Sequence, residues 1–385
     1  MNPAPIWINT GELSGDMHGA ALLRALQQRE PELRSVGMGG VHLAAAGMDT
    51  LFRIEDLSVM GVSEVMARLP QILGLLSAIK KSLAVVRPRA LVVIDAPSFH
   101  FRLIRAARSL GIPVYYYISP KAWAWREKRA EFIKNNVRRL ISILPFEVDF
   151  YRRFNMEIDY VGNPLVDMVD YQAIRHIRPV PGRIGLLPGS RKKEISSLLP
   201  QFGGAARILR AKLPHLHFAC LRAPGFSEDY LRSYWPEDVP LELLEPGQRW
   251  QEMRRCEMLI AASGTVTLES AIAGVPTLAA YKVSPLTYLL ARMMLRIRFI
   301  SLANLILDRQ IFPELLQKDC DAGPLAESAL RWLLPPDGSR RLQGIRDELR
   351  ELRERLGPPG AVGRAADIII ADLADLRKTE AAKGA

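Results

Sequence analysis

Residues 258–282, MLIAASGTVTLESAIAGVPTLAAYK, contain the pattern that decides the fold. An apolar run leads into a small polar turn at 263–265, a helical segment, a Gly-Val-Pro break and a second apolar run. This order predicts strand, loop, helix and strand, the repeating unit of a buried parallel sheet. Open α/β sheets bind ligands in the loops at the carboxyl ends of their strands, so we expect the turn to belong to a binding site.

Small and acidic residues in this segment suit a ligand rich in oxygen. Gly264 lets a ligand approach the backbone closely, while the hydroxyls of Ser263 and Thr265 can cap the helix or donate to a phosphate. Glu269 lies within an otherwise small and apolar helix, where its carboxylate can accept hydrogen bonds from sugar hydroxyls. The segment therefore predicts a pocket for a nucleotide sugar.

Size and composition bound the class of protein. A chain of 385 residues is too long for one core and suits two domains. An excess of 52 Lys and Arg over 41 Asp and Glu favours an anionic partner. The basic residues are dispersed, which argues against nucleic acid. Three scattered cysteines indicate neither disulfides nor structural zinc, and no signal peptide or uncharged apolar run of 18 residues is visible. We expect a cytoplasmic protein that does not span a membrane.

Short apolar runs alternate with amphipathic helical patterns through both halves of the chain. This alternation predicts an α/β protein with two Rossmann-like doubly wound domains facing a cleft. The predicted division is an N-terminal domain at 1–170, a linker at 171–183, a second domain at 184–356, and a C-terminal helix and tail at 357–385. We expect the last helix to cross back to the first domain.

The turn NTGELSGDMHG after the opening strand is the first candidate for chemistry. It matches neither the GxGxxG nor the GxxxxGK[ST] pattern, which argues against a nicotinamide dehydrogenase and against ATP binding. Gly15 permits a tight turn, and Ser14 or Asp16 can cap the following helix. An ordinary capped turn explains these residues equally well, but Glu12 within the turn is expected to point into the cleft.

Asp95 ends the apolar run LVVIDAPSFH at the carboxyl edge of the predicted sheet. Partial burial beside apolar walls can raise the pKa of its carboxyl toward a value useful for a general base. The alternative is an Asp that caps a helix or forms an ion pair. His100 is a lesser candidate for a base, and a buried polar histidine is the other interpretation.

Two further loops follow predicted strands. Trp123 and Trp125 stand beside basic residues, which suits stacking on a sugar face, a membrane interface or packing beneath the domain. Gly189, Ser190 and Arg191 begin a predicted helix, where free N–H groups and a guanidinium can bind a diphosphate.

The segments 59–79 and 284–300 carry many Leu, Ile and Met with interspersed arginines. This composition suits helices that lie on an anionic bilayer with their arginines among the head groups. Packing in the core is the alternative for each segment.

Nine blocks in the same order resemble lipid-A-disaccharide synthase, a family of glycosyltransferases with the GT-B architecture. They are GELSGD (11–16), the MG of LSVMGVSEV (57–65), IDAP (94–97), SP…WAWR (119–126), LPFE (144–147), VGNPLVD (161–167), LLPGSR (186–191), ASGTVTLE (262–269) and SLANLIL (301–307). Together the blocks cover nearly the whole chain. Ala303, where many relatives have Pro, and Lys121-Ala122 are mild departures that affect loop shape.

The resemblance implies an inverting transfer of 2,3-diacylglucosamine from its UDP derivative to 2,3-diacylglucosamine 1-phosphate, giving the β-1,6-linked disaccharide and UDP without a metal or other cofactor. It implies that Asp95 is the candidate catalytic base, with Glu12 of the cleft as a second catalytic residue, and that Arg191, Glu269 and Asn304 contact the nucleotide. Which of Glu12, Asp95 and His100 shares the proton stays open. The residues expected to support the acceptor side or its loops are Ser14, Gly15, Asp16, His100, Trp123 and Trp125.

The physical requirements of the transfer agree with this assignment. A carboxylate must take the proton of the acceptor hydroxyl, and cations or helix N-termini must stabilise the departing diphosphate. We expect the reaction in the interdomain cleft, gated by closure, on a protein that contacts the anionic inner face of the cytoplasmic membrane. The sequence leaves open whether the chain forms a homodimer.

Two alternatives remain beside this prediction. One is another GT-B enzyme that acts on UDP-GlcNAc, such as a 2-epimerase or a peptidoglycan transferase. The other is a non-catalytic membrane adaptor that binds a nucleotide sugar.

Overall fold

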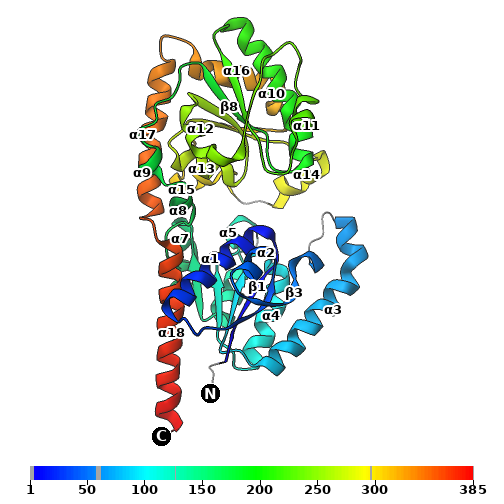
Figure 1. The fold of residues 1–385 in the computed structure, drawn as a ribbon, viewed down its shortest axis with the longest axis vertical. Coiled ribbons are helices and arrows are strands. Elements are labelled where there is room, and N and C mark those ends of the chain that lie inside the picture. The colour runs from blue at the N-terminus through cyan, green and yellow to red at the C-terminus, as the bar shows by residue number, and fades with distance from the viewer. Residues whose placement is uncertain (1–3, 58–61, 126, 295–296, 385) are drawn as a thin grey trace. The chain divides into compact units, whose positions relative to one another are not determined.

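The computed structural model describes residues 4–57, 62–125, 127–294 and 297–384 (Figure 1). The chain forms two compact units: unit 1 is Met1–Pro164 with Pro359–Ala385, and unit 2 is Leu165–Pro358. The units therefore divide at Pro164 and Leu165, before the linker predicted at 171–183. Residues Tyr171–Ile174 of that stretch form helix α9 within unit 2, where the Arg353 guanidinium carbon lies 3.8 Å from the centroid of the Tyr171 ring.

Unit 1 contains a parallel sheet with the strand order β3-β2-β1-β4-β5-β6-β7. Its strands are β1 (Ile6–Thr10), β2 (Ser35–Gly39), β3 (Asp49–Arg53), β4 (Ala90–Ile94), β5 (Val114–Tyr117), β6 (Arg139–Ser142) and β7 (Asp159–Tyr160). Its helices are α1 (Leu13–Arg29), α2 (Val41–Ala45), α3 (Val62–Val86), α4 (Pro97–Ser109), α5 (Ala122–Trp125), α6 (Arg129–Asn136), α7 (Phe146–Arg152) and α18 (Ala361–Gly384). The strand order reverses direction between β1 and β4, so the loops after these two strands meet at a switch point.

Apolar residues on both faces explain why β1 and β4 are central strands. Every residue of both strands is buried, as expected for a parallel sheet covered by helices on each side. Ile6 and Ile8 pack in a core with α1 and α18, while Trp7 between them packs in a second core with α3 and α4. The alternation of side chains along the strand thus divides the apolar residues between two helical layers.

Helix α18 completes one layer of unit 1, although it follows unit 2 in the chain. Its residues Ala366 and Ile369 are fully buried in the core that contains α1, and the two helices lie side by side in Figure 1. Asp367 forms an ion pair with Arg29 of α1. The prediction that the last helix crosses back to the first domain is confirmed.

Unit 2 contains a second parallel sheet, with the order β10-β9-β8-β11-β12-β13. Its strands are β8 (Arg183–Leu187), β9 (His217–Leu221), β10 (Glu242–Leu244), β11 (Met258–Ala262), β12 (Thr277–Tyr281) and β13 (Glu314–Leu316). Its helices are α8 (Leu165–Met168), α9, α10 (Lys192–Lys212), α11 (Glu228–Arg232), α12 (Arg249–Arg255), α13 (Thr265–Ile272), α14 (Pro285–Met294), α15 (Leu302–Leu307), α16 (Ala322–Leu333) and α17 (Gly338–Leu356). The order reverses between β8 and β11, which are both buried, and this confirms the predicted strand–loop–helix–strand unit at 258–282.

Among the described residues, one helix has a window long and apolar enough to cross a membrane. The window is Leu69–Val86 of α3, with a mean hydropathy of 1.4, and only 17% of it is buried. Lys80 and Lys81 interrupt it, which is why no uncharged run is visible in the sequence. The window places an accessible apolar surface on unit 1, which includes the exposed side chains of Leu69, Leu73 and Val85. The Met60-Gly61 part of the resemblance lies outside the described residues.

Candidate active site

Asp95 directly follows β4 and turns back over the loop after β1. Its carboxylate accepts hydrogen bonds from the N–H groups of Gly11, at 2.8 Å, and Glu12, at 3.2 Å. Asp95 and Ala96 both have positive φ values, of 60° and 36°. Two successive non-glycine residues in this region are strained, and such strain concentrates at functional sites.

The glycines of the GELSG motif make room for this carboxylate. A Cβ atom at Gly15 would lie 1.7 Å from Asp95 Oδ2, and one at Gly11 would lie 2.3 Å from the Cβ of Ala96. Gly15 belongs to the first turn of α1, so the Asp95 carboxylate lies against a helix N-terminus. The motif therefore serves close approach between two loops, as well as the tight turn expected from its sequence.

A buried network of hydrogen bonds fixes the main chain of Asp95. Its carbonyl oxygen accepts hydrogen bonds from His100 Nδ1, at 2.7 Å, and from the Tyr116 hydroxyl, at 2.9 Å. His100 Nε2 lies 3.0 Å from Asn9 Nδ2, and Asn9 Oδ1 accepts from Trp7 Nε1. A carbonyl can only accept, so Nδ1 carries the ring proton.

Burial lowers the pKa of His100 to about 4, which keeps the ring neutral near pH 7. Both of its nitrogens are occupied within the network. His100 thus corresponds to the alternative interpretation, a satisfied buried histidine, and it positions Asp95. Asn9 and Tyr116 were not recognised in the sequence, because their importance depends on a contact between strands that no local pattern reveals.

Burial raises the pKa of Asp95 to about 8, and the negative charge of Glu12 contributes to the increase. The N–H groups of Gly11 and Glu12 oppose this shift but do not cancel it. A carboxyl with a pKa near the working pH can exist in its basic form and also retain a proton once it has accepted one. Asp95 therefore has the properties of a general base for a hydroxyl group.

Asp16 does not cap α1, the helix that contains it, contrary to the expectation from the sequence. Its buried carboxylate accepts hydrogen bonds from the N–H groups of Gly40, at 2.7 Å, His42, at 2.8 Å, and Leu43, at 3.2 Å. It therefore caps α2, which begins 25 residues later in the sequence. Neither Ser14 nor Asp16 caps α1, whose N-cap is Glu12 without a side-chain hydrogen bond.

Trp123 is held by a buried acid of the LPFE block. Its indole N–H donates to Glu147 Oε1 at 2.9 Å, and its ring packs edge-on against Phe146 with centroids 4.9 Å apart. Glu147 also accepts from Ser142, and burial raises the pKa of this glutamate to about 7. The contacts of Trp123 are those of the packing alternative, while the side chain of Trp125 lies outside the described residues.

In unit 2, the Gly189–Arg191 loop follows β8 and precedes α10. The Glu194 carboxylate accepts from the N–H groups of Ser190, at 3.0 Å, and Arg191, at 3.3 Å. It also pairs with the Arg191 guanidinium at 2.9 Å. Gly189 has a φ of 110°, and a Cβ atom there would lie 2.4 Å from Glu194 Oε2. Glu194 thus closes the start of α10 as a capping box, and the binding of a diphosphate expected at this loop stays a prediction.

The turn at Ser263–Thr265 follows β11 and leads into α13, whose first residue is Thr265. Gly264 has an extended backbone with φ 171°, and a Cβ atom there would meet no heavy atom within 4 Å. The fold itself therefore does not require glycine at this position, and the close approach of a ligand expected there stays a prediction. Glu269 is buried further along α13, where its Oε2 accepts from Trp250 Nε1 and pairs with Arg249, each at 3.0 Å.

Asn304 has a structural role that its sequence context did not reveal. Its buried amide donates to the Phe312 carbonyl, at 2.8 Å, and to Glu314, at 2.9 Å. Its Oδ1 accepts from the N–H groups of Ile311, at 3.0 Å, and Phe312, at 2.9 Å. These bonds use both donors and both acceptor positions of the amide. The Asn304 side chain thus shapes the loop between α15 and β13, and the contact with the nucleotide expected of this residue stays a prediction.

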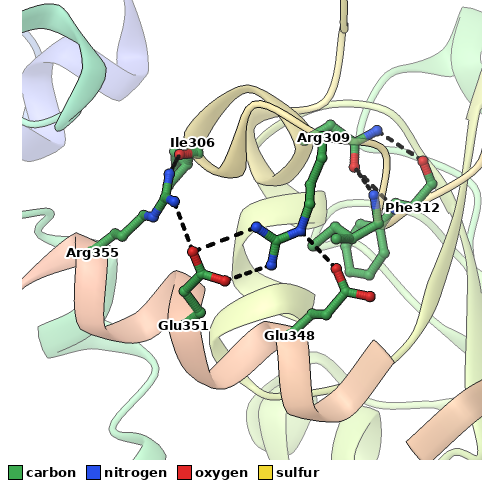
Figure 2. A network of polar contacts seen from close by, with 8 residues as sticks. Ile306, Arg309, Phe312, Glu348, Glu351 and Arg355 are labelled. Carbon is green, nitrogen blue, oxygen red and sulfur yellow. Dashed lines mark hydrogen bonds and ion pairs between the residues drawn. The ribbon is translucent and has the colours of Figure 1, made fainter. Parts of the chain in front are cut away.

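Figure 2 shows the ion pairs that connect the loop between α15 and β13 to α17. Arg309 donates to Glu348 at 2.9 Å and to Glu351 at 2.5 Å, and Glu351 also pairs with Arg355 at 2.7 Å. The chain from α15 to β13 is therefore anchored both by the Asn304 amide and by the two ion pairs of Arg309.

Within the described part of the chain, no group of three or more His, Cys, Asp or Glu side chains could hold a metal ion.

Solved structures share this two-sheet fold. The calicheamicin glycosyltransferase CalG4 superposes with a TM-score of 0.62 at 15% identity, covering 98% of this chain and 100% of that chain. The UDP-GlcNAc 2-epimerase of Neisseria meningitidis, solved with UDP-GlcNAc, gives 0.61 at 13% identity, covering 96% and 100%. At such identities the likeness concerns the fold alone. The fold is that of the GT-B class, which is found both in glycosyltransferases and in 2-epimerases.

Sequence similarity separates these possibilities. The family model for lipid-A-disaccharide synthetase matches residues 6–355. The lipid-A-disaccharide synthase of Syntrophus aciditrophicus (strain SB) is 38% identical over 374 residues, which cover 95% of this chain and 97% of the relative. The chain belongs to the lipid-A-disaccharide synthase family and is a glycosyltransferase. The resemblance predicted from its motifs is confirmed, and the 2-epimerase alternative is not favoured.

Proposed function

We propose that the chain transfers 2,3-diacylglucosamine from its UDP derivative to 2,3-diacylglucosamine 1-phosphate with inversion at the anomeric carbon. The products are the β-1,6-linked disaccharide 1-phosphate and UDP. Family membership supports the substrates and the reaction. The observation that carries the mechanism is the Asp95 carboxylate, which is held by two N–H groups and has a pKa raised to about 8.

In this mechanism, Asp95 is the general base. As the acceptor hydroxyl oxygen attacks the anomeric carbon, its proton passes to the carboxylate, and the bond from the anomeric carbon to the diphosphate oxygen breaks. The diphosphate leaves with the electron pair of that bond. The raised pKa helps because a more basic carboxylate takes the proton more readily in the transition state. His100 and Tyr116 contribute by fixing the carbonyl of the same residue.

The donor is assigned to the loops of unit 2. The diphosphate would take the place of the Glu194 carboxylate on the N–H groups of Ser190 and Arg191, and Arg191 would turn from Glu194 to the leaving charge. The open N-terminus of α13 offers further donors near Gly264. Glu269 is assigned to the ribose, with Arg249 and Trp250 fixing its carboxylate.

The proposal includes contact with the anionic inner face of the cytoplasmic membrane, because both substrates carry acyl chains. Exposed apolar side chains on α3 and α14 support it, among them Leu73, Leu289 and Met293. Sedimentation with phosphatidylglycerol vesicles tests this contact. Sedimentation equilibrium without lipid tests the homodimer that the sequence left open.

The deciding experiment combines the purified protein with both lipid substrates and follows UDP release and disaccharide formation. The expected result is equal amounts of the two products, with loss of both in Asp95→Asn and with UDP binding retained. UDP-GlcNAc replaces the acylated donor in a parallel assay, and efficient turnover of it would favour a different GT-B enzyme. UDP binding without UDP release in the presence of both lipids would contradict the proposal and indicate a non-catalytic adaptor.

A further inference from the structure

A pocket rich in arginine lies in unit 2, away from the loops assigned to the donor. It has a volume of about 270 Å³, and the side chains that define its character are Tyr171, Arg254, Arg346, Arg350 and Arg353. No acidic side chain is among the described residues that line it. The pocket is therefore a concave surface with a strong positive charge.

The topology separates this pocket from the donor loops. Its lining includes Pro179 before β8, Arg254 before β11 and Gly274 before β12, so it lies at the amino edge of the sheet. The loops at 189–191 and 263–265 follow β8 and β11 at the carboxyl edge. A strand of five residues spans about 17 Å, so the two regions are distinct sites.

Three of the arginines lack a carboxylate partner. Arg254, Arg346 and Arg353 donate to main-chain carbonyls and to no carboxylate in the described parts of the chain. The acceptors are the carbonyls of Gly274, Arg175 and Ile177 for Arg254, Glu257 for Arg346, and Ile272 for Arg353, at 2.9–3.4 Å. The buried Nε–H groups of Arg254 and Arg346 have no acceptor. Arg350, in contrast, pairs with Asp347.

The electrostatic environment favours an anion at this place. Burial lowers the pKa of Arg254, Arg346 and Arg353, and the charge of Arg254 lowers the pKa of the other two further. Glu257, Asp347 and Glu354 are the acids close enough to act on these groups, and in the described parts of the chain none of their carboxylates is hydrogen bonded to the three arginines. Partly buried like charges repel one another and destabilise the folded state, so a bound anion would relieve a cost that the protein otherwise carries.

The ring of Tyr171 contacts the guanidinium groups of Arg353 and Arg254 without using their N–H donors. The Arg353 guanidinium carbon lies 3.8 Å from the ring centroid, and that of Arg254 lies 6.0 Å from it. Stacking on an aromatic face holds a guanidinium plane while its N–H groups stay free for a ligand. This arrangement reduces the entropy lost when an anion binds.

We propose that this pocket binds a phosphate group, with Arg254, Arg346 and Arg353 as its hydrogen-bond donors. A guanidinium fork matches two phosphate oxygens, and several forks suit a doubly charged phosphate better than a carboxylate. The same chemistry is offered by free phosphate or diphosphate and by the head group of an anionic phospholipid. The site is independent of the glycosyl transfer proposed above.

The test titrates the full-length protein with inorganic phosphate and with diphosphate by calorimetry, at constant ionic strength, with and without UDP. We expect binding that UDP does not displace. The double variant R346Q/R353Q should weaken it about tenfold or more, because two charge-assisted hydrogen-bond donors are lost. Arg340→Gln is the matched control, since Arg340 is exposed on the same helix and does not line the pocket.

A second variant guards against misfolding of the first. Arg350 lines the pocket but pairs with Asp347 rather than with the main chain, so Arg350→Gln should leave the fold intact and weaken binding several-fold. Vesicles of phosphatidylglycerol and of phosphatidylcholine identify the source of the phosphate. Weaker sedimentation of R346Q/R353Q than of wild type with the anionic vesicles assigns a lipid head group. Calorimetric binding of phosphate together with equal sedimentation of the two proteins assigns free phosphate.

Three outcomes would overturn the proposal. One is that neither free phosphate nor the anionic vesicles bind. Another is that binding is equal in the wild-type protein and in folded R346Q/R353Q and R350Q. The third is that UDP displaces all the phosphate, which would assign the binding to the donor loops instead.

Discussion

The contact between Gly15 and Asp95 offers a sensitive test of the proposed base. An alanine at position 15 would place its Cβ 1.7 Å from Asp95 Oδ2, whereas real Cβ contacts essentially never fall below 3.0 Å. The carboxylate oxygen therefore has to move by about 1.3 Å. A misplacement of about 1 Å at a reacting group can cost about 10²-fold in rate. We expect Gly15→Ala to lower kcat about 10²-fold, equivalent to about 3 kcal/mol of transition-state stabilisation.

Binding and stability should change much less than the rate. UDP binds to unit 2 in the proposed mechanism, so its Kd should remain as in the wild-type protein. Alanine is a better helix former than glycine by up to about 1 kcal/mol, which offsets part of the strain introduced in α1. Steady-state kinetics, calorimetry with UDP and urea unfolding measure these three quantities separately.

Gly19→Ala provides the matched control, because it makes the same substitution one turn later in α1. A Cβ atom at Gly19 would lie 3.1–3.3 Å from side-chain ends of Leu43, Ile94 and Thr10, which need to shift by only a few tenths of an ångström. We expect its kcat to stay within a few-fold of wild type. A folded Gly15→Ala protein with wild-type kcat would refute the assignment of Asp95 as the base.

Four further predictions rest on the contacts of Asp95, Glu12 and Asn304. The base must be ionised, so kcat/KM should rise with pH and level off above the Asp95 pKa of about 8, a limb that Asp95→Asn should lack in residual activity measurements. Folding raises the pKa of Asp95 from 3.8 to about 8, so the free energy of unfolding falls as pH rises from 3.8 to about 8. Asp95→Asn lacks this titration and should therefore unfold at a higher urea concentration than wild type at pH 8 but not at pH 4. Glu12→Gln removes a charge that raises the Asp95 pKa, so the limb in the pH profile should shift to lower pH without disappearing. Asn304→Ala leaves the buried N–H groups of Ile311 and Phe312 without their acceptor, and urea unfolding should show a loss of about 2–4 kcal/mol.

The placement of the candidate groups could be predicted because it depends on strand ends. An apolar run followed by a polar residue identifies the carboxyl edge of a parallel strand, and this was sufficient for Asp95, Arg191 and Gly264. The strand order brings the loops after β1 and β4 together, and likewise those after β8 and β11. The alternation of apolar strand patterns with helical patterns thus locates both candidate regions from the sequence alone.

The roles of Asp16, His100 and Asn304 could not be predicted in the same way. Asp16 caps a helix beyond the next strand, and Asn304 bonds to a loop that returns after α15. Each partner is chosen by the tertiary path of the chain, about which a local motif carries no information. A polar residue in a motif can therefore be required for the shape of a site without touching the ligand.

The position of α18 has a consequence for how the protein is made. Unit 2 is inserted between two parts of unit 1, and Ala366 and Ile369 of α18 belong to the core that contains α1. During synthesis, all of unit 2 emerges before that core can be closed, so unit 2 is able to fold first. Until α18 docks, the apolar residues of α1 that it covers stay exposed and prone to association. A nascent chain of this enzyme thus depends on its last helix to protect its first one.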